Sequence, residues 1–373
     1  MSNIHQMSEQ NGSFGDLSRT KRKLKFFFLA LLIYAILILV TSFTSVYSQE
    51  NNGGYAESYL LRNIGARATS MGGAYTAIAN EPSAIFYNPA GIAFLPAKPM
   101  LMASVSNLGL GRTHSTLAYA QTLNEEIGFG IALNSLNSQE FAQRDLQGYK
   151  IGNLQDWQYS LHLAAAYRKE SVSVGASLKY LNHSLIGSNI YATGAALDLG
   201  TKFDVLDLFT FGASVQNIGS IMTWNQYDFE GAVSELLPYN VRTGIATEFG
   251  LNDDYYVSRS KEDGSIRQVY VPPTRYILVS LDAVMYQYDK NPSFVLGVEA
   301  VPYEMIALRG GITLYGQNEG KVGFLPMNYW SGGFSIKPTF DNLPMKFNID
   351  YSINKEFLSA SGLTHNISII MEF

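Results

Sequence analysis

Long segments in which apolar and polar residues alternate constrain the fold of this chain more than any other feature. In EIGFGIALNSL, residues 126–136, the apolar residues Ile127, Phe129, Ile131 and Leu133 alternate with small or polar ones. A period of two places one set of side chains on each face of a β-strand. The pattern therefore predicts strands with one apolar face and one wet face.

Fourteen such segments follow one another from residue 100 to the C-terminus. Most are longer than the five or six residues usual in soluble sheets, and they are long enough to cross a bilayer when tilted. An even number of long antiparallel strands is typical of a closed membrane barrel. The predicted strands are 100–107, 115–123, 126–135, 156–168, 171–181, 189–203, 208–217, 239–250, 275–286, 293–301, 305–315, 328–337, 345–354 and 363–373.

Three features favour a transmembrane barrel over a soluble sandwich with the same alternation. The faces opposite the apolar ones collect glycine, serine and asparagine, which suits a wet or plugged lumen. The chain ends in LTHNISIIMEF, and a terminal Phe373 on an amphipathic strand resembles the signal that the barrel assembly machinery recognises. Tyrosines also stand at predicted strand ends, as in interfacial girdles: Tyr167, Tyr180, Tyr191, Tyr239 and Tyr315. We therefore predict an all-β fold: a single transmembrane antiparallel β-barrel of about 14 strands, surrounded by outer-membrane lipid.

The N-terminus has the features of a secretory signal peptide. Five basic residues between positions 19 and 25 precede the apolar run 26–40, and Val46 and Ser48 have the small-residue spacing of a cleavage site. We predict a signal peptide over residues 1–48 and a mature chain that begins at Gln49. The alternative is an uncleaved membrane anchor, although a span needs about 20 apolar residues.

The composition excludes several classes of function. The formal net charge is −5, and removal of residues 1–48, which carry five basic and two acidic residues, would change it to −8. This balance disfavours nucleic acid as a partner. The chain has no cysteine, so it has no disulfide framework, thiolate metal site or cysteine nucleophile.

Connection lengths agree with both termini lying in the periplasm, because the even-numbered turns are short there. One even-numbered connection, residues 251–274, is long. Its Asp263-Gly264 pair between two apolar runs is typical of a hairpin turn. We predict a small periplasmic hairpin; the alternative is a miscounted strand.

Residues 49–99 are predicted to form a hatch, a plug inside the barrel, and residues 100–373 the barrel itself. A barrel of 14 strands is too wide for its own side chains to fill. The stretch 65–95, GARATSMGGAYTAIANEPSAIFYNPAGIAFL, is rich in small residues that can pack closely in such a lumen. Its candidate hatch residues are Gly65, Arg67, Met71, Gly72, Gly73, Asn88, Pro89, Ala90 and Gly91.

This stretch resembles the N-terminal hatch of the PorV/PorQ family, which is similar to the FadL-like outer-membrane transporters that share an N-P-A element. VGASLKYL at 174–181, FGASVQNIG at 211–219 and the run 296–312 agree with the resemblance. It implies a hatch-plugged barrel of 14 strands that is not an enzyme. PorV-like members carry cargo for type IX secretion, so the implied partners are secretion-system components and secreted cargo proteins. The alternative is a FadL-like importer of long-chain fatty acids or other hydrophobic compounds, and a barrel lipid hydrolase is third.

Three charged residues share the polar face of successive predicted strands: Asp282, Glu299 and Arg309. Pairing across the turn at 302–305 places Glu299 opposite Arg309. The favoured interpretation is a lumen ion pair that fixes strand register, because buried charges must be paired. The other interpretation is a contact with the hatch or the substrate.

Catalytic and metal sites are not indicated. The five histidines show no metal-binding spacing, and no cofactor motif is present, since MGGAYT lacks the lysine of a phosphate loop. Ser160 and His162 share a lumen face, as a hydrolase would require, but the sequence shows no third partner for them.

Overall fold

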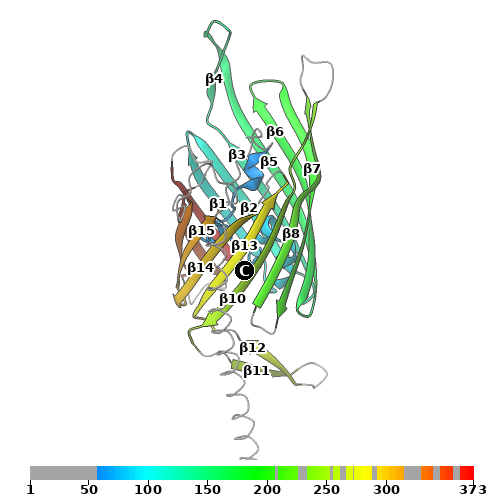
Figure 1. Ribbon diagram of the computed structural model, residues 1–373, viewed down its shortest axis with the longest axis vertical. Coiled ribbons are helices and arrows are strands. Elements are labelled where there is room, and N and C mark those ends of the chain that lie inside the picture. Colours follow the sequence, from blue (N-terminus) through cyan, green and yellow to red (C-terminus); the bar gives the residue numbers. More distant parts are fainter. Residues whose placement is uncertain are drawn as a thin grey trace, which may run out of the picture.

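The computed structural model describes residues 57–205, 209–225, 233–252, 255–260, 266–271, 273–287, 292–314, 329–338, 345–355 and 362–373. The predicted signal peptide, residues 1–48, and Tyr315 lie outside these ranges. Most described residues belong to one tall barrel (Figure 1).

The barrel is a closed antiparallel sheet of 14 strands, as the alternation predicted. Pairing of β1 with β18 joins the two ends of the strand series, and pairing of β8 with β10 completes the ring. The barrel strands are β1 (Met100–Gly109), β2 (Arg112–Thr122), β3 (Ile127–Asn137), β5 (Lys150–Lys169), β6 (Val172–Ile186), β7 (Ile190–Val205), β8 (Phe209–Asn225), β10 (Asn240–Gly250), β13 (Tyr276–Tyr286), β14 (Ser293–Tyr303), β15 (Ile306–Leu314), β16 (Trp330–Ile336), β17 (Lys346–Asn354) and β18 (Thr364–Glu372).

The two ends of the barrel differ. At the short-turn end, where β18 ends, tight connections such as Glu304–Met305 join the strands. At the opposite end, which we call the loop end, β5, β6, β7 and β8 extend further than the other strands, and β4 (Phe141–Arg144) and β9 (Val233–Leu236) pair with the extensions of β5 and β8. These extensions form one high side of the wall (Figure 1).

The outer surface of the wall is apolar. Leu163 is 52% exposed on the outside of β5, whereas its neighbour His162 is 1% exposed and faces inward. The same alternation holds in β3, where Ile131 is exposed and Gly130 is buried. So broad an exposed apolar surface is typical of a barrel wall in contact with lipid.

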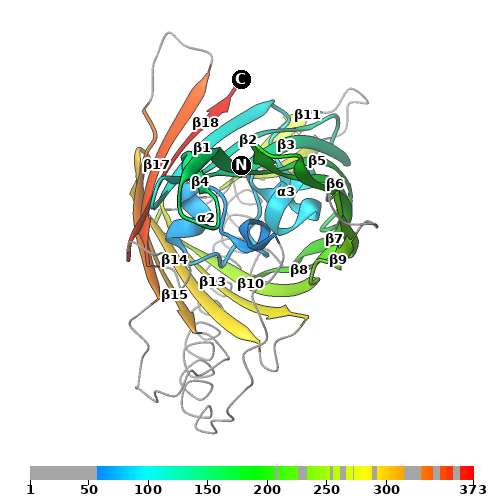
Figure 2. The ribbon, with the colours of Figure 1, turned by 90° about the horizontal axis from the view of Figure 1, so that it is seen from above.

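The hatch lies inside the ring (Figure 2). It contains four short helices: η1 (Ser58–Leu61), α2 (Ala66–Ser70), α3 (Ala84–Tyr87) and η2 (Pro89–Phe94). Ser83 precedes α3, and its hydroxyl donates to Glu81 Oε1 at 2.8 Å and does not cap the helix. Among the helices that the structure describes, none is long and apolar enough to span a membrane.

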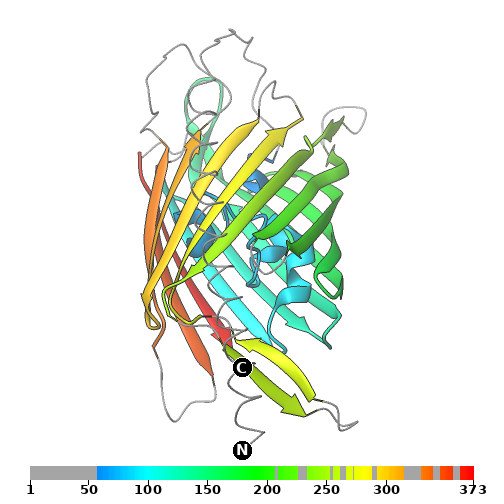
Figure 3. The ribbon, with the colours of Figure 1, turned by 60° about the horizontal axis from the view of Figure 1, so that its bottom comes forward.

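A separate two-stranded sheet lies within the long connection 251–274. Strands β11 (Tyr255–Ser260) and β12 (Ile266–Val271) pair antiparallel at the short-turn end (Figure 3). The predicted turn residues Asp263 and Gly264 lie outside the described residues.

Some details of the strand prediction were wrong. Tyr180, expected at a strand end, lies inside β6 opposite Leu161, because β6 continues to Ile186. Strands β4 and β9 were not predicted. Each has only four residues, and most of these are exposed, so neither strand shows alternation.

Candidate functional site

The hatch backbone lies very close to the barrel wall at several strands. A Cβ atom on Gly311 would overlap the Met71 backbone, one on Gly175 would overlap Ala90, and one on Gly212 would overlap Thr76. Each barrel strand carries Gly, Ala or Ser on its inward face at this level. We call this set the small-residue band: Ser104, Ala118, Gly130, Ala164, Gly175, Gly200, Gly212, Gly244, Ser280, Gly297, Gly311, Gly333, Ser352 and Ser368.

Glycines in the hatch allow it to turn within this narrow space. Gly65, directly before α2, has φ 84°, and Gly72 and Gly73 after α2 have φ 70° and 90°. Such positive values favour glycine. Met71, fully buried, packs against Gly297 and Gly311 of the wall. The predicted hatch glycines therefore shape the chain for close packing.

The N-P-A-G element is bound to the wall through Asn88. Its Nδ2 donates to the carbonyls of Thr76 at 3.0 Å and Thr201 at 2.9 Å, while its Oδ1 accepts from Ala90 N at 3.2 Å. Pro89 is the first residue of η2, and Gly91 is so close to the Ala79 carbonyl that a Cβ would overlap it. This element thus joins two parts of the hatch to β7.

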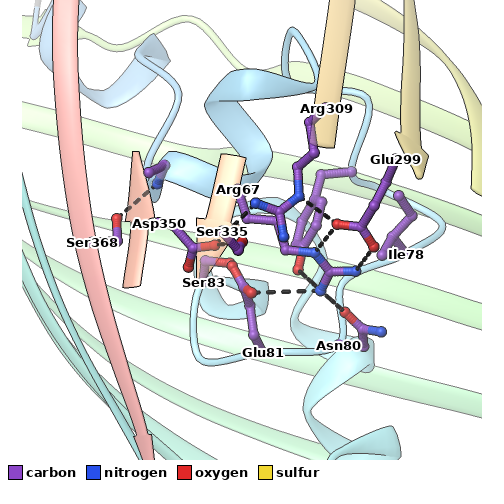
Figure 4. Close-up of polar contacts among 12 residues, drawn as sticks. Arg67, Ile78, Asn80, Glu81, Ser83, Glu299, Arg309, Ser335, Asp350 and Ser368 are labelled. Carbon is purple, nitrogen blue, oxygen red and sulfur yellow. Dashed lines mark hydrogen bonds and ion pairs between the residues drawn. The ribbon is translucent and has the colours of Figure 1, made fainter. Parts of the chain in front are cut away.

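Arg67 is the centre of a buried ion network between hatch and wall (Figure 4). Its Nε and Nη2 each donate to Glu299 at 2.8 Å, and its Nη1 lies 3.5 Å from Glu81. Arg309 pairs with the same Glu299 and, at 2.9 Å, with Asp350. Burial raises the pKa of Glu81, and Arg67 opposes that shift. Arg67 thus binds the hatch to Glu299 of β14, and Arg309 of β15 links this carboxylate to Asp350 of β17.

Glu299 lies directly opposite Arg309, as predicted, and the pair contacts the hatch as well as fixing the register. Asp282 is not part of this network. It accepts from the backbone N–H groups of Tyr75 at 3.1 Å and Thr76 at 2.9 Å, and lies 3.7 Å from Arg242 Nη2. The three residues predicted to form one cluster therefore attach the hatch to the wall at two separate places, one at Glu299 and Arg309 and the other at Asp282.

Sequence reasoning missed Arg242 and Asp350. Arg242 donates to the Gly73 carbonyl at 2.7 Å and lies over the Tyr87 ring, 5.2 Å from its centroid. Asp350 completes the Arg67 network. In the alternation of their strands, both residues fall on the face that points into the lumen, and this position could have identified them from the sequence.

Ser160 and His162 do not form a hydrolase site. Their Oγ and Nε2 atoms are 3.0 Å apart on the lumen face, but both residues are buried and His162 Nδ1 has no hydrogen-bond partner. Catalysis of this kind needs a group that orients the histidine and an accessible nucleophile. In the described part of the chain, no cluster of His, Cys, Asp and Glu could hold a metal ion.

Two small cavities separate the hatch from the wall on its loop-end side. The first has a volume of about 20 Å³ and is lined by Leu60, Ile64, Phe86, Asn134 and His162, among others. The second, about 90 Å³, lies between the hatch and β13–β17 and is lined by Gly72, Arg242 and Trp330, among others. Neither reaches the roughly 150 Å³ that accommodates benzene in a protein core.

Phe373 is 44% exposed at the short-turn end, and its N–H donates to the Pro99 carbonyl at 3.1 Å. Its role in recognition by the assembly machinery stays a prediction.

These features define a class: antiparallel barrels of 14 strands whose lumen is filled by an N-terminal hatch. The structure is similar to the toluene transporter TbuX of Ralstonia pickettii, with a TM-score of 0.52 and 15% identity, over 84% of this chain and 99% of that one. For the toluene transporter TodX of Pseudomonas putida, the TM-score is 0.48 and the identity 12%, over 88% of this chain and 99% of that one. For a Pseudomonas aeruginosa FadL homologue, the TM-score is 0.48 and the identity 10%, over 83% of this chain and 97% of that one. At such identities the similarity establishes the fold alone.

In sequence, residues 39–190 match the profile of an uncharacterised protein family (UPF0164). No curated protein sequence matches the chain.

Proposed function

We propose that this protein is an outer-membrane transporter that moves small hydrophobic compounds past a movable hatch. The observation that carries the proposal is the hatch-filled barrel, whose fold is that of TbuX, a toluene transporter. Export by the predicted signal peptide and insertion into the outer membrane are part of the proposal. The predicted importer thus replaces the predicted secretion carrier as the favoured function.

The dimensions of the lumen support a gated route. The two cavities beside the hatch are smaller than an aromatic ring requires, so a substrate passes only when part of the hatch moves. Arg67, Asp282 and Asn88 attach the middle of the hatch to the wall. Its first residues, 57–64, are attached through Glu57 and His183 and otherwise lie over the cavities. A lumen that opens only on demand admits a substrate without leaking ions.

Uptake measurements test this function. Cells that express the protein should accumulate radiolabelled toluene or oleate faster than a deletion strain, and purified protein should produce the same difference in liposomes. Equal uptake with and without the protein for both compounds would contradict the transporter.

The role in type IX secretion stays a prediction. The same deletion strain can be used to test this role. If secreted proteins accumulate in its periplasm while its uptake of toluene and oleate is unchanged, the secretion carrier is favoured over the transporter.

A further inference from the structure

Beneath the first residues of the hatch, the barrel wall is polar. We call residues 57–64 the hatch arm, and Asn134, Ser160, His162 and Lys179 the polar wall patch. These four side chains lie on β3, β5 and β6, face the lumen and are at most 5% exposed. The four residues are neighbours across adjacent strands: Asn134 lies opposite Ser160, and His162 lies opposite Lys179. The patch is therefore one continuous surface.

Two hydrogen-bonding atoms of the patch have no partner. Asn134 accepts from Thr116 Oγ1 at 2.9 Å through its Oδ1, whereas its Nδ2, on the side chain that interacts with His114, has no partner within hydrogen-bond geometry. His162 Nε2 is bound to Ser160, whereas its Nδ1 is unpartnered. Both residues line the cavity of about 20 Å³ under the arm. Each such buried, unpaired atom is unfavourable, so this surface is suited to a polar group that the protein itself does not supply.

The charges at this cavity favour a neutral ligand. Lys179 Nζ is 2.8 Å from Asp198 Oδ1 and donates to Asn217 at 2.7 Å. Two further cations line the cavity: Arg242 lies 3.7 Å from Asp282, and Arg62 is not without a partner. An anion here would add a charge next to pairs that are already compensated, and that is costly in a buried site. A hydroxyl group can instead accept from Asn134 and bond with either tautomer of His162.

One side of the cavity is aromatic and apolar. The Phe86 ring meets His162 edge to face, with centroids 4.7 Å apart, and Leu60, Ile64 and Tyr87 lie beside it. Polar side chains also line the cavity: Arg62, Asn63, Gln216 and Asn240. Aromatic faces and edges attract another ring in such arrangements. The cavity itself holds about one water molecule, so a ring enters only when the arm moves away from the wall.

We propose that the polar wall patch binds the hydroxyl group of the transported compound, and that the preferred substrates are neutral hydroxylated aromatic compounds of the phenol class. This inference rests on the proposed function and specifies its substrate. Asn134 and His162 recognise the hydroxyl, and Phe86 packs against the ring.

Calorimetry on the purified full-length protein in detergent tests the proposal with phenol, toluene and benzoate as probes. We expect phenol to bind at least fivefold more tightly than toluene. His162→Phe, which keeps a ring beside Phe86, should weaken phenol binding about tenfold and leave toluene within twofold, since one hydrogen bond is lost. Asn134→Leu provides a second variant if His162→Phe does not fold. The matched control is Ser352→Ala, which alters another buried, unpartnered lumen residue far along the wall and should change neither affinity.

Each other outcome has a defined meaning. Toluene binding as tightly as phenol, or a phenol preference that survives both variants, would overturn the inference while the transporter stands. Benzoate binding more tightly than phenol would also overturn it, in favour of an anionic substrate. If no ring compound binds and none is taken up, the proposed function itself fails.

Discussion

Gly310 and Gly311 are neighbours in β15, yet their surroundings are opposite. A Cβ on Gly311 would overlap the backbone of Met71 and Gly72, whereas a Cβ on Gly310 would meet nothing within 4 Å. Inward glycines of this kind keep the hatch in contact with the wall. The constraint on them is steric, because neither of these two glycines has a positive φ.

At the residue scale we therefore predict a strong asymmetry between two substitutions. Gly311→Val should lower the free energy of unfolding by about 1–3 kcal/mol, because the added methyl groups force Met71 away from the wall. Gly310→Val adds the same groups toward the outside and should be nearly neutral. Thermal unfolding in detergent measures both, and equal effects of the two variants would show that the hatch does not press on β15.

At the scale of elements, the strands follow from the sequence because lipid on one side and the lumen on the other force a period of two. The pattern failed in β8, where the β7 pairing shifts register near Asn217 and Gly219, both with positive φ. Extra residues there break the alternation, so the strand appeared to end at 217. The hatch attachments were beyond sequence reasoning, since Arg67 and Glu299 are 232 residues apart and no local period relates them.

Strand β17 offers a direct test of which face meets lipid. Ile349→Arg places a charge on the outer face, where Ile349 is 44% exposed, and should cost about 2 kcal/mol or more in the membrane. Asn348→Arg points into the lumen and should be tolerated. Heat-modifiable migration on gels reports folded barrel in outer-membrane fractions. Equal amounts of folded barrel for both variants would argue against a lipid-facing outer surface.

At the scale of the whole molecule, the barrel and hatch form one closed body. The hatch is held to the wall by three features: the ion network of Arg67, the hydrogen bonds to Asp282 and the small-residue band. The hatch arm is attached at its first residue, because Glu57 Oε1 lies 2.7 Å from His183 Nδ1 of β6, but the rest of the arm covers wall residues whose hydrogen-bonding atoms are unpaired. The molecule therefore combines a firmly held plug with one region suited to movement.

This arrangement predicts the electrical behaviour of the protein. In planar bilayers the unmodified protein should conduct almost no ions. Gly73→Trp should leak, because Gly73 has φ 90° and any side chain there overlaps Asn63. The control Gly148→Trp changes a glycine with φ 89° and no atom within 4 Å of its Cβ position, so it should stay closed. Steady conductance of the unmodified protein would contradict a sealed lumen.

The small-residue band also sets an order of events during biogenesis. The hatch lies against the wall so closely at several strands that a finished cylinder would have little room to receive it. The seam between β1 and β18 joins the first strand of the ring to the last, and Ser368 of β18 accepts a hydrogen bond from Ala66 N of the hatch at 2.7 Å. The chain segment before β1 must therefore already be seated when the last strand arrives, so the plug acts as an internal template on which the cylinder is completed.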